Sequence, residues 1–260
     1  MSASAAAGQL ESHLASLDPE TLAFILSDWQ VWARDDQLPP ATTAAGADWR
    51  VWLILGGRGA GKTRAGAEWV RAKALGIPPL GEERATRIAL VGETLSDVRR
   101  VMIEGVSGLL GVHRADERPE LEISKAQLVW PNGSIAQMFS AEDPDSLRGP
   151  QFDAAWCDEL AKWRRPEETW DMLQFGMRLG ESPAIAVTTT PRPLPLLKSI
   201  MDDPATVITR AATSANAAHL APAFIAEMER RYAGTALGRQ ELRGEIVDEQ
   251  SGSLWRRDWV

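Results

Sequence analysis

A glycine-rich segment, residues 51–66, carries the residue types best suited to bind a chain of phosphates. An apolar, β-branched run leads into a glycine cluster and then into a helix-forming stretch, VWLILGGRGAGKTRAG. Gly56, Gly61, Lys62 and Thr63 match the pattern G-x-x-x-x-G-K-[ST] in the strand–loop–helix context that the pattern requires. The alternative interpretation is a glycine-rich turn that binds nothing. The pattern favours a nucleoside triphosphate site.

Each part of this segment has a physical role in such a site. The glycines are expected to adopt positive φ and to turn successive N–H groups inward, which makes an anion nest. The helix that begins near Gly61 adds the positive end of its dipole. Lys62 is expected to reach the β- and γ-phosphates, and the Thr63 hydroxyl to bind Mg²⁺. The predicted nucleotide-binding loop comprises Gly56, Gly57, Arg58, Gly59, Ala60, Gly61, Lys62 and Thr63.

A site that hydrolyses a nucleotide also needs carboxylates. Asp158 and Glu159 follow a short apolar strand predicted over residues 153–157. At a strand end, an aspartate can hold Mg²⁺, and a neighbouring glutamate can activate the attacking water as a general base. Alone, the pair could equally be the acidic start of a helix. Behind a phosphate loop, it favours hydrolysis over phosphoryl transfer to a small molecule.

The rest of the chain alternates predicted strands with predicted helices. Apolar positions recur at helical spacing over 21–33, and a hairpin is predicted over 126–139 with its turn at Asn132–Gly133. The other strands are predicted over 51–55, 87–91, 184–188 and 205–210; the other helices are predicted over 62–75, 95–110, 194–202 and 222–232, with one more from Pro166 to a stop at Gly180. This alternation indicates an α/β fold, with a mostly parallel central sheet flanked by helices.

Composition narrows the functional classes. A length of 260 residues with 44% hydrophobic residues suits one large globular domain. The net charge of −8 excludes a globally basic nucleic-acid binder, and the single cysteine, Cys157, excludes a disulfide framework. No apolar run approaches the roughly 20 residues of a membrane span. We therefore expect a cytoplasmic protein without a membrane partner.

Five segments together resemble the large terminase subunit of tailed phages and phage-like gene transfer agents. They are WLILGGRGAGKTRAGAEW, VGETLSDVRRVMIEG, SLRGPQFDAAWCDEL, TTTPRP and LGRQELRGEIVDEQSGSLW, and the similarity runs from about residue 29 to 260. The resemblance implies a P-loop NTPase of the additional-strand, RecA-like class. It implies an ATP-hydrolysing motor that drives double-stranded DNA into a procapsid, in a bacterial or infected host cell. Its implied partners are a portal protein, a small terminase subunit and further copies of itself in a ring, whereas the isolated chain should be a monomer.

The resemblance also assigns roles to single residues. Asp158 matches the metal-binding carboxylate and Glu159 the catalytic one. Thr188, Thr189 and Thr190 match a coupling motif that senses hydrolysis; the alternative for them is strand-end hydrogen bonding before a proline turn.

Two further pairs of residues keep alternatives open. An arginine on the developing charge speeds phosphoryl transfer, and Arg148 matches the arginine that reaches a neighbouring subunit's nucleotide. Arg58, inside the loop, is the second candidate and could instead be a structural fork. Arg34 and Gln37 match the region that contacts adenine, or are solvated loop residues.

The expected domain organisation is a lead-in over residues 1–48, an ATPase core over 49–244 and a linker over 245–260. In the family, a nuclease domain follows the linker. The sequence ends at Val260, before the acidic metal site of that domain, so we expect no nuclease activity from this chain. Two other functions stay open at this point. One is a helicase-like P-loop ATPase, which would need a second RecA-like domain. The other is a prophage remnant that binds nucleotide without hydrolysing it.

Overall fold

A computed structural model of the chain describes residues 12–247, which divide into two compact units between Arg34 and Asp35. The first unit contains α2 (Pro19–Ser27) and α3 (Trp29–Trp32). The single helix expected over 21–33 is therefore wrong, because Asp28 is extended and its side chain accepts a hydrogen bond from the Gln30 amide. A short polar side chain that caps one helix in this way ends the helix before it.

The second unit is built on one eight-stranded sheet in the order β3-β4-β5-β2-β6-β7-β1-β8. The β3–β4 and β4–β5 pairs are antiparallel, and the other neighbouring pairs of this sheet are parallel. The predicted mostly parallel α/β sheet is confirmed. The strands are β1 (Val51–Gly56), β2 (Arg87–Gly92), β3 (Glu120–Glu122), β4 (Gln127–Val129), β5 (Ile135–Ser140), β6 (Ala154–Asp158), β7 (Ala184–Thr189) and β8 (Thr206–Ala211).

One strand, β7, lies between β1 and β6, and this is the additional-strand arrangement that the resemblance implies. Thr188 pairs with Asp158 on one side and with Ile54 on the other. The carboxyl ends of three parallel strands thus meet along one edge, where ligands of open α/β sheets bind.

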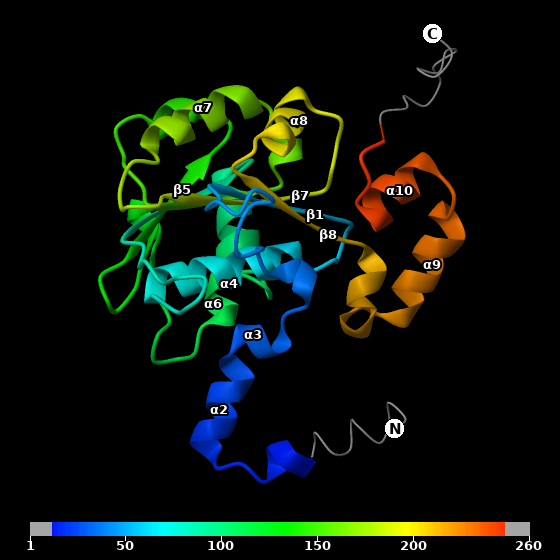
Figure 1. Cartoon of the computed structure of the whole chain (residues 1–260), viewed down its shortest axis with the longest axis horizontal. Coiled ribbons are helices and arrows are strands. Elements are labelled where there is room, and N and C mark those ends of the chain that lie inside the picture. Colours follow the sequence, from blue (N-terminus) through cyan, green and yellow to red (C-terminus); the bar gives the residue numbers. More distant parts are fainter. Residues whose placement is uncertain (1–11, 248–260) are drawn as a thin grey trace. The chain divides into compact units, whose positions relative to one another are not determined.

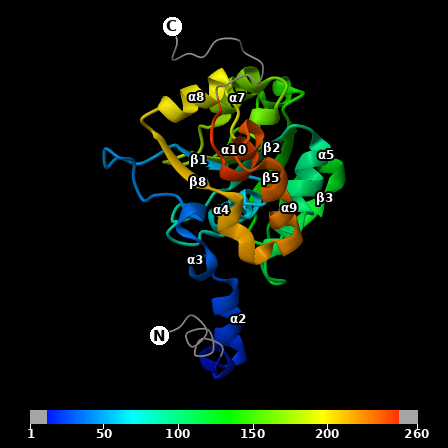
Figure 2. The same cartoon turned by 90° about the vertical axis from the view of Figure 1, so that its right-hand side faces the viewer.

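Helices cover both faces of the sheet. In Figure 1, α4 (Lys62–Leu75) and α6 (Leu109–Val112) lie on one side, and α7 (Pro166–Gly176) and α8 (Pro195–Asp202) lie on the other. Past the β1–β8 end lie η6 (Thr213–His219), α9 (Pro222–Tyr232) and α10 (Ala236–Arg243), which face the viewer in Figure 2. Shorter turns are η1 (Asp35–Gln37), α5 (Leu95–Asp97), η2 (Val98–Ile103), η3 (Ile123–Lys125), η4 (Pro144–Leu147) and η5 (Leu160–Lys162).

The core explains why the central strands read as continuous apolar runs. All six residues of β1 are buried. Val51, Leu53 and Leu55 join one apolar cluster with residues of α7 and α8, while Trp52 and Ile54 alternate with them along the strand. A parallel strand covered on both faces needs apolar side chains at every position.

Most predicted strands and helices are found within about two residues of their expected bounds, but the expected helix over 95–110 is not. It is broken into α5, the π-helical turn η2 and α6. Gly105 and Gly108 fall between the last two, and glycine is a poor helix former. The hairpin that turns at Asn132–Gly133 is confirmed, with Gly133 at φ 86°.

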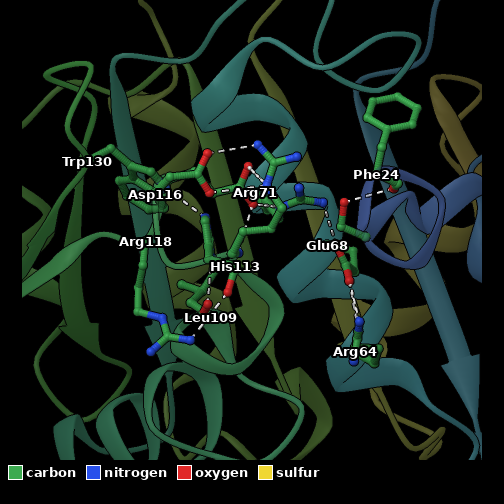
Figure 3. A network of polar contacts seen from close by, with 12 residues as sticks. Phe24, Arg64, Glu68, Arg71, Leu109, His113, Asp116, Arg118 and Trp130 are labelled. Carbon is green, nitrogen blue, oxygen red and sulfur yellow. Dashed lines mark hydrogen bonds and ion pairs between the residues drawn. The ribbon is translucent and has the colours of Figure 1, made fainter. Parts of the chain in front are cut away.

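Figure 3 shows a network of charged side chains that ties α4 to the loop after α6. Glu68 accepts hydrogen bonds from Arg64 at 2.6 Å and from Arg71 at 3.4 Å, and Arg71 also pairs with Glu117 at 2.6 Å. Glu68 and Arg71 are buried. Burial raises the pKa of the Glu68 carboxyl in spite of the two guanidiniums. For the Glu68 carboxyl, the cost of desolvation thus exceeds the attraction of the two guanidiniums.

Beside this network, His113 is buried between two hydrogen bonds. Its Nδ1 lies 2.6 Å from the Leu109 carbonyl, and its Nε2 accepts a hydrogen bond from the Trp130 indole at 2.8 Å. The ring is therefore neutral, with its proton on Nδ1. Burial lowers the pKa of His113 to about 4.

Within residues 12–247, no helix has the length and apolar character needed to cross a bilayer. The predicted linker over 245–260 falls mostly outside the described residues, so the expected domain organisation stays a prediction.

Candidate active site

The phosphate loop runs from the end of β1 to the first turn of α4. Gly59 and Gly61 have φ of 70° and 91°, in the left-handed region. We expected positive φ at Gly56 and Gly57 as well, and this is wrong. These two positions need glycine for another reason: a Cβ would lie 3.0 Å from the Ala211 carbonyl at Gly56, and 2.6 Å from the Leu242 carbonyl at Gly57.

Lys62 makes several of the contacts within the loop. Its buried ammonium donates to the Gly56 and Gly57 carbonyls at 3.0 Å and to the Thr190 hydroxyl at 3.2 Å. It also lies 3.8 Å from Oε1 of Glu159. Burial lowers the pKa of Lys62, and the Glu159 charge opposes that shift. The predicted phosphate-binding lysine and the predicted general base thus face each other across the loop.

The carboxylates of Asp158 and Glu159, at the end of β6, lie in different environments. Asp158 is buried and accepts a hydrogen bond from the Thr188 hydroxyl at 2.6 Å. Burial, with a further contribution from the Glu159 charge, raises the pKa of Asp158 to about 6. A neighbouring divalent cation would favour the ionised form of such a carboxylate.

Glu159 adopts an uncommon backbone conformation, with φ 50° and ψ 43°. Its amide donates to the Thr188 carbonyl at 2.6 Å, and its Oε2 accepts from the Thr190 amide at 3.3 Å. A non-glycine residue in the left-handed region is strained and needs its surroundings to hold it there. In this conformation, Oε1 of the carboxylate lies 3.8 Å from the Lys62 ammonium.

The three predicted coupling threonines link separate parts of the site. Thr188 bonds to Asp158, and Thr190 bonds to Lys62 and Glu159. Thr189 accepts a hydrogen bond from the Ala161 amide at 3.0 Å, just after the carboxylates. Strand-end hydrogen bonding and contact with the site are therefore both present, and the role as a motif that senses hydrolysis stays a prediction.

The two candidate arginines occupy different places. Arg58 donates from Nε to Oε2 of Glu241 on α10 at 2.7 Å. Arg148 is 68% exposed, pairs with Asp145 at 2.9 Å and lines a hollow of about 360 Å³ with Phe175. Both side chains are about equally exposed, 67% for Arg58 and 68% for Arg148, and the two arginines differ in that only Arg58 belongs to the phosphate loop.

The predicted adenine-side residues are separated by the boundary between the two units. Gln37 is buried, and its amide Nε2 donates to the Gly61 carbonyl at 3.2 Å, so it contacts the loop directly. Arg34 ends the first unit, and its role stays a prediction. Ala60 is buried inside the loop, with its amide 3.3 Å from the Gly57 carbonyl.

Sequence reasoning missed several residues of the site. Lys162 lies 3.6 Å from Oε2 of Glu159, and its spacing of three residues along the chain could have signalled this. Glu241 and Asn216 come from the C-terminal helices, and Asn216 donates to the Gly59 carbonyl at 2.7 Å. No local pattern marks these long-range contacts.

The donors present fit a magnesium–nucleotide complex. The Thr63 hydroxyl in the first turn of α4 and the Asp158 carboxylate at the end of β6 are the hard oxygen ligands that Mg²⁺ takes in proteins. The left-handed Gly59 and Gly61 shape the loop that leads to the start of α4, and a helix N-terminus binds anions.

Comparison with known proteins places this geometry in a family. The model described as terminase large subunit, T4likevirus-type, N-terminal, matches residues 53–260. No curated protein sequence matches the chain.

Solved structures show the same fold at low sequence identity. The large terminase of a thermophilic bacteriophage gives a TM-score of 0.62 at 16% identity, covering 85% of this chain and 52% of that one. It has also been solved with ADP and with ATP-gamma-S. A mutant ATPase domain from the large terminase of Thermus phage P74-26 gives 0.59 at 16% identity, covering 83% and 94%. The HK97 bacteriophage large terminase gives 0.58 at 20% identity, covering 88% and 50%. The chain thus spans about half the length of the first and third of these proteins.

Proposed function

The chain belongs to the terminase large subunit family, as its N-terminal part, and on this premise we propose that it is an ATPase that drives double-stranded DNA into a procapsid. One observation carries the proposal: Lys62 and Glu159 lie 3.8 Å apart at the carboxyl edge of the sheet, beside the phosphate loop. The related large terminase solved with ADP and with ATP-gamma-S supports a nucleotide as the ligand.

In the proposed reaction, the residues of this chain bind, orient and move a proton. Lys62 exchanges its contacts with the Gly56 and Gly57 carbonyls for phosphate oxygens, which compensate its charge better than neutral carbonyls do. Thr63 and Asp158 would hold Mg²⁺, which would supply neutralisation of the phosphate charge. Glu159 then orients a water and accepts its proton. Thr190 is hydrogen-bonded to both Lys62 and Glu159. A phosphate that draws Lys62 away from Thr190 would therefore also affect the position of the proposed base.

We expect ATP turnover to depend on assembly because of Arg148. Its guanidinium is exposed and pairs only weakly with another exposed side chain, Asp145. We propose that it stabilises the transition state in the site of a neighbouring copy, in a ring on a portal protein together with a small terminase subunit. The isolated chain should then be a monomer with weak turnover.

The test is ATP turnover by the chain alone and with portal, small subunit and DNA. We expect turnover to rise on assembly by at least about 10²-fold, and Arg148→Ala to remove most of that rise because an arginine finger is worth about 10³–10⁵ in rate. Binding of a fluorescent ATP analogue by the isolated variant should stay unchanged. The matched control is Arg178→Ala, which removes another exposed arginine from the same hollow.

Two results would contradict the proposal in different ways. An assembled Arg148→Ala complex with full turnover would remove the arginine from the reaction. A wild-type chain that binds no nucleotide, alone or assembled, would remove the ATPase itself.

A further inference from the structure

A carboxylate from the C-terminal helices lies at the rim of the phosphate loop. Glu241 on α10 receives the Arg58 guanidinium, and its side chain is only 16% exposed. We propose that this carboxylate is an internal stand-in for the terminal phosphate: it holds Arg58 until a nucleoside triphosphate displaces it. Glu241 is then a positioning residue for the arginine, and α10 is released when the triphosphate binds. The inference rests on the proposed function and adds a regulation of that site.

Two hydrogen bonds join the loop to Glu241. The Arg58 side chain donates from Nε to the carboxylate at 2.7 Å, and the Arg58 amide donates to the Glu241 backbone carbonyl, also at 2.7 Å. An amide of the loop and its one guanidinium are thus both engaged by the same residue. These are the two kinds of donor that a phosphate loop offers to a phosphate oxygen.

The charge of Glu241 reaches the cations of the loop. Its hydrogen bond raises the pKa of Arg58, and the Glu159 charge adds to that shift. Lys62, whose pKa burial lowers, also feels the negative charge of Glu241. Glu241 therefore lies where an anion interacts with the two loop cations that a phosphate would meet.

The rest of the C-terminal segment fixes Glu241 in this position. The Thr213 hydroxyl donates to the Arg58 carbonyl at 2.7 Å. A Cβ on Gly57 would lie 2.6 Å from the Thr213 hydroxyl and 2.8 Å from the Glu241 carbonyl. Because the Arg58 amide is bonded to the Glu241 carbonyl and Gly57 packs against the same backbone, the loop can separate fully from Glu241 only if α10 moves. Loss of the ion pair removes one of the two bonds that hold α10 against the loop.

The proposal distinguishes triphosphate from diphosphate. A γ-phosphate brings charged oxygens that compete with Glu241 for the guanidinium, whereas ADP lacks that group. Without the Glu241 charge, a triphosphate no longer has to displace a competing anion. The difference between ATP and ADP affinity should therefore increase in a variant that lacks the charge.

The experiment measures equilibrium binding of fluorescent ADP and of a fluorescent, non-hydrolysable ATP analogue to the full chain. In Glu241→Gln we expect the ATP analogue to bind about three- to fivefold tighter, the effect of removing one partly exposed ion pair, and ADP binding to stay unchanged. Glu241→Asp keeps the charge and should stay near wild type. Glu227→Gln is the matched control, because it removes an ion pair with Arg230 that lies within α9.

Hydrogen exchange of residues 236–243 supplies a second readout. In wild type, the ATP analogue should speed exchange there and ADP should not; in Glu241→Gln, exchange should already be fast without nucleotide. Equal changes in ATP and ADP affinity, or exchange in α10 that the ATP analogue does not alter, would overturn the proposal while leaving the ATPase intact. A wild-type chain that binds neither nucleotide would instead overturn the proposed function and, with it, this inference.

Discussion

Two clusters of buried charge begin on the same helix, α4, and they differ in how their charges are compensated. On one side of the helix, Glu68 lies between Arg64 and Arg71 at 2.6 Å and 3.4 Å (Figure 3). At the helix start, the nearest carboxylate oxygen to Lys62 is 3.8 Å away, and the ammonium is bound by neutral carbonyls and a hydroxyl.

We interpret the first cluster as structural and propose that the second is functional. In the first cluster, opposite charges are in direct contact within the chain. Burial shifts pKa values in both clusters: it raises that of Glu68 in the first, and it lowers that of Lys62 and raises that of Asp158 to about 6 in the second. The clusters differ in pairing, since Lys62 approaches Glu159 only to 3.8 Å. Groups that are desolvated and incompletely paired are ready to accept charge from a ligand. Removing a charge should therefore affect stability in the first cluster and chemistry in the second.

The largest expected effect is on chemistry. Glu159→Gln keeps the size of the side chain and removes the proton acceptor, so ATP turnover should fall by about 10³-fold while nucleotide binding persists. Steady-state turnover and equilibrium binding, measured on the same preparation, check this. Turnover within tenfold of wild type would deny Glu159 the role of base and would remove the functional half of the comparison.

The next effect is on stability. Arg71→Leu leaves Glu68 and Glu117 with fewer opposite charges in a buried place, so unfolding should become easier by about 3 kcal/mol. Urea denaturation measures the change, and turnover at a temperature where the variant is folded should be unaltered. A loss of turnover without a loss of stability would show that the network acts on the site and would erase the distinction between the clusters.

The smallest effect sharpens the comparison through pH. The pKa of His113 is about 4 in the fold, below its usual value near 6.5, so the unfolded chain binds the extra proton first as pH falls. The neutral His113 ring makes its full contribution to the free energy of unfolding when the pH is above the pKa that His113 has in the unfolded chain. This contribution is lost as pH falls from there towards about 4, by about 2 kcal/mol between about pH 7.5 and about pH 5.

Denaturation of wild type and His113→Gln at both pH values isolates this contribution. The variant should be less stable at neutral pH and should lose the corresponding part of the acid slope. His219→Gln, at an exposed position, serves as the control and should keep the wild-type slope. An unchanged slope in His113→Gln would mean that another group causes the acid sensitivity.

The sequence predicted best what depends on neighbouring residues. The run Val51–Gly56 is a strand because its side chains are apolar at every position, and the loop after it is set by glycine, lysine and threonine at fixed spacing. The alternation of strands and helices indicated a mostly parallel sheet, whereas the order that places β7 between β6 and β1 was implied by the family resemblance. The whole second unit could therefore be assigned to its fold class without coordinates.

What the sequence did not predict depends on contacts between distant segments or on competition within a few residues. Glu241 meets Arg58 across 183 positions of the chain, and nothing near either residue signals the other. Asp28 could have continued a helix or capped the next one, and hydrophobic spacing does not decide between them. The left-handed backbone of Glu159 is imposed by β7, through the bond from its amide to the Thr188 carbonyl.

The left-handed backbone of Glu159 has a consequence for any attempt to raise the thermal stability of the protein. Relieving the left-handed strain with Glu159→Gly would gain about 1 kcal/mol of folding free energy. The substitution would also remove the carboxylate that we propose as the general base. Selection for a higher melting temperature would therefore favour glycine at residue 159, whereas selection for ATP turnover would favour glutamate. A library of variants sorted on melting temperature alone would lose the proposed catalytic activity.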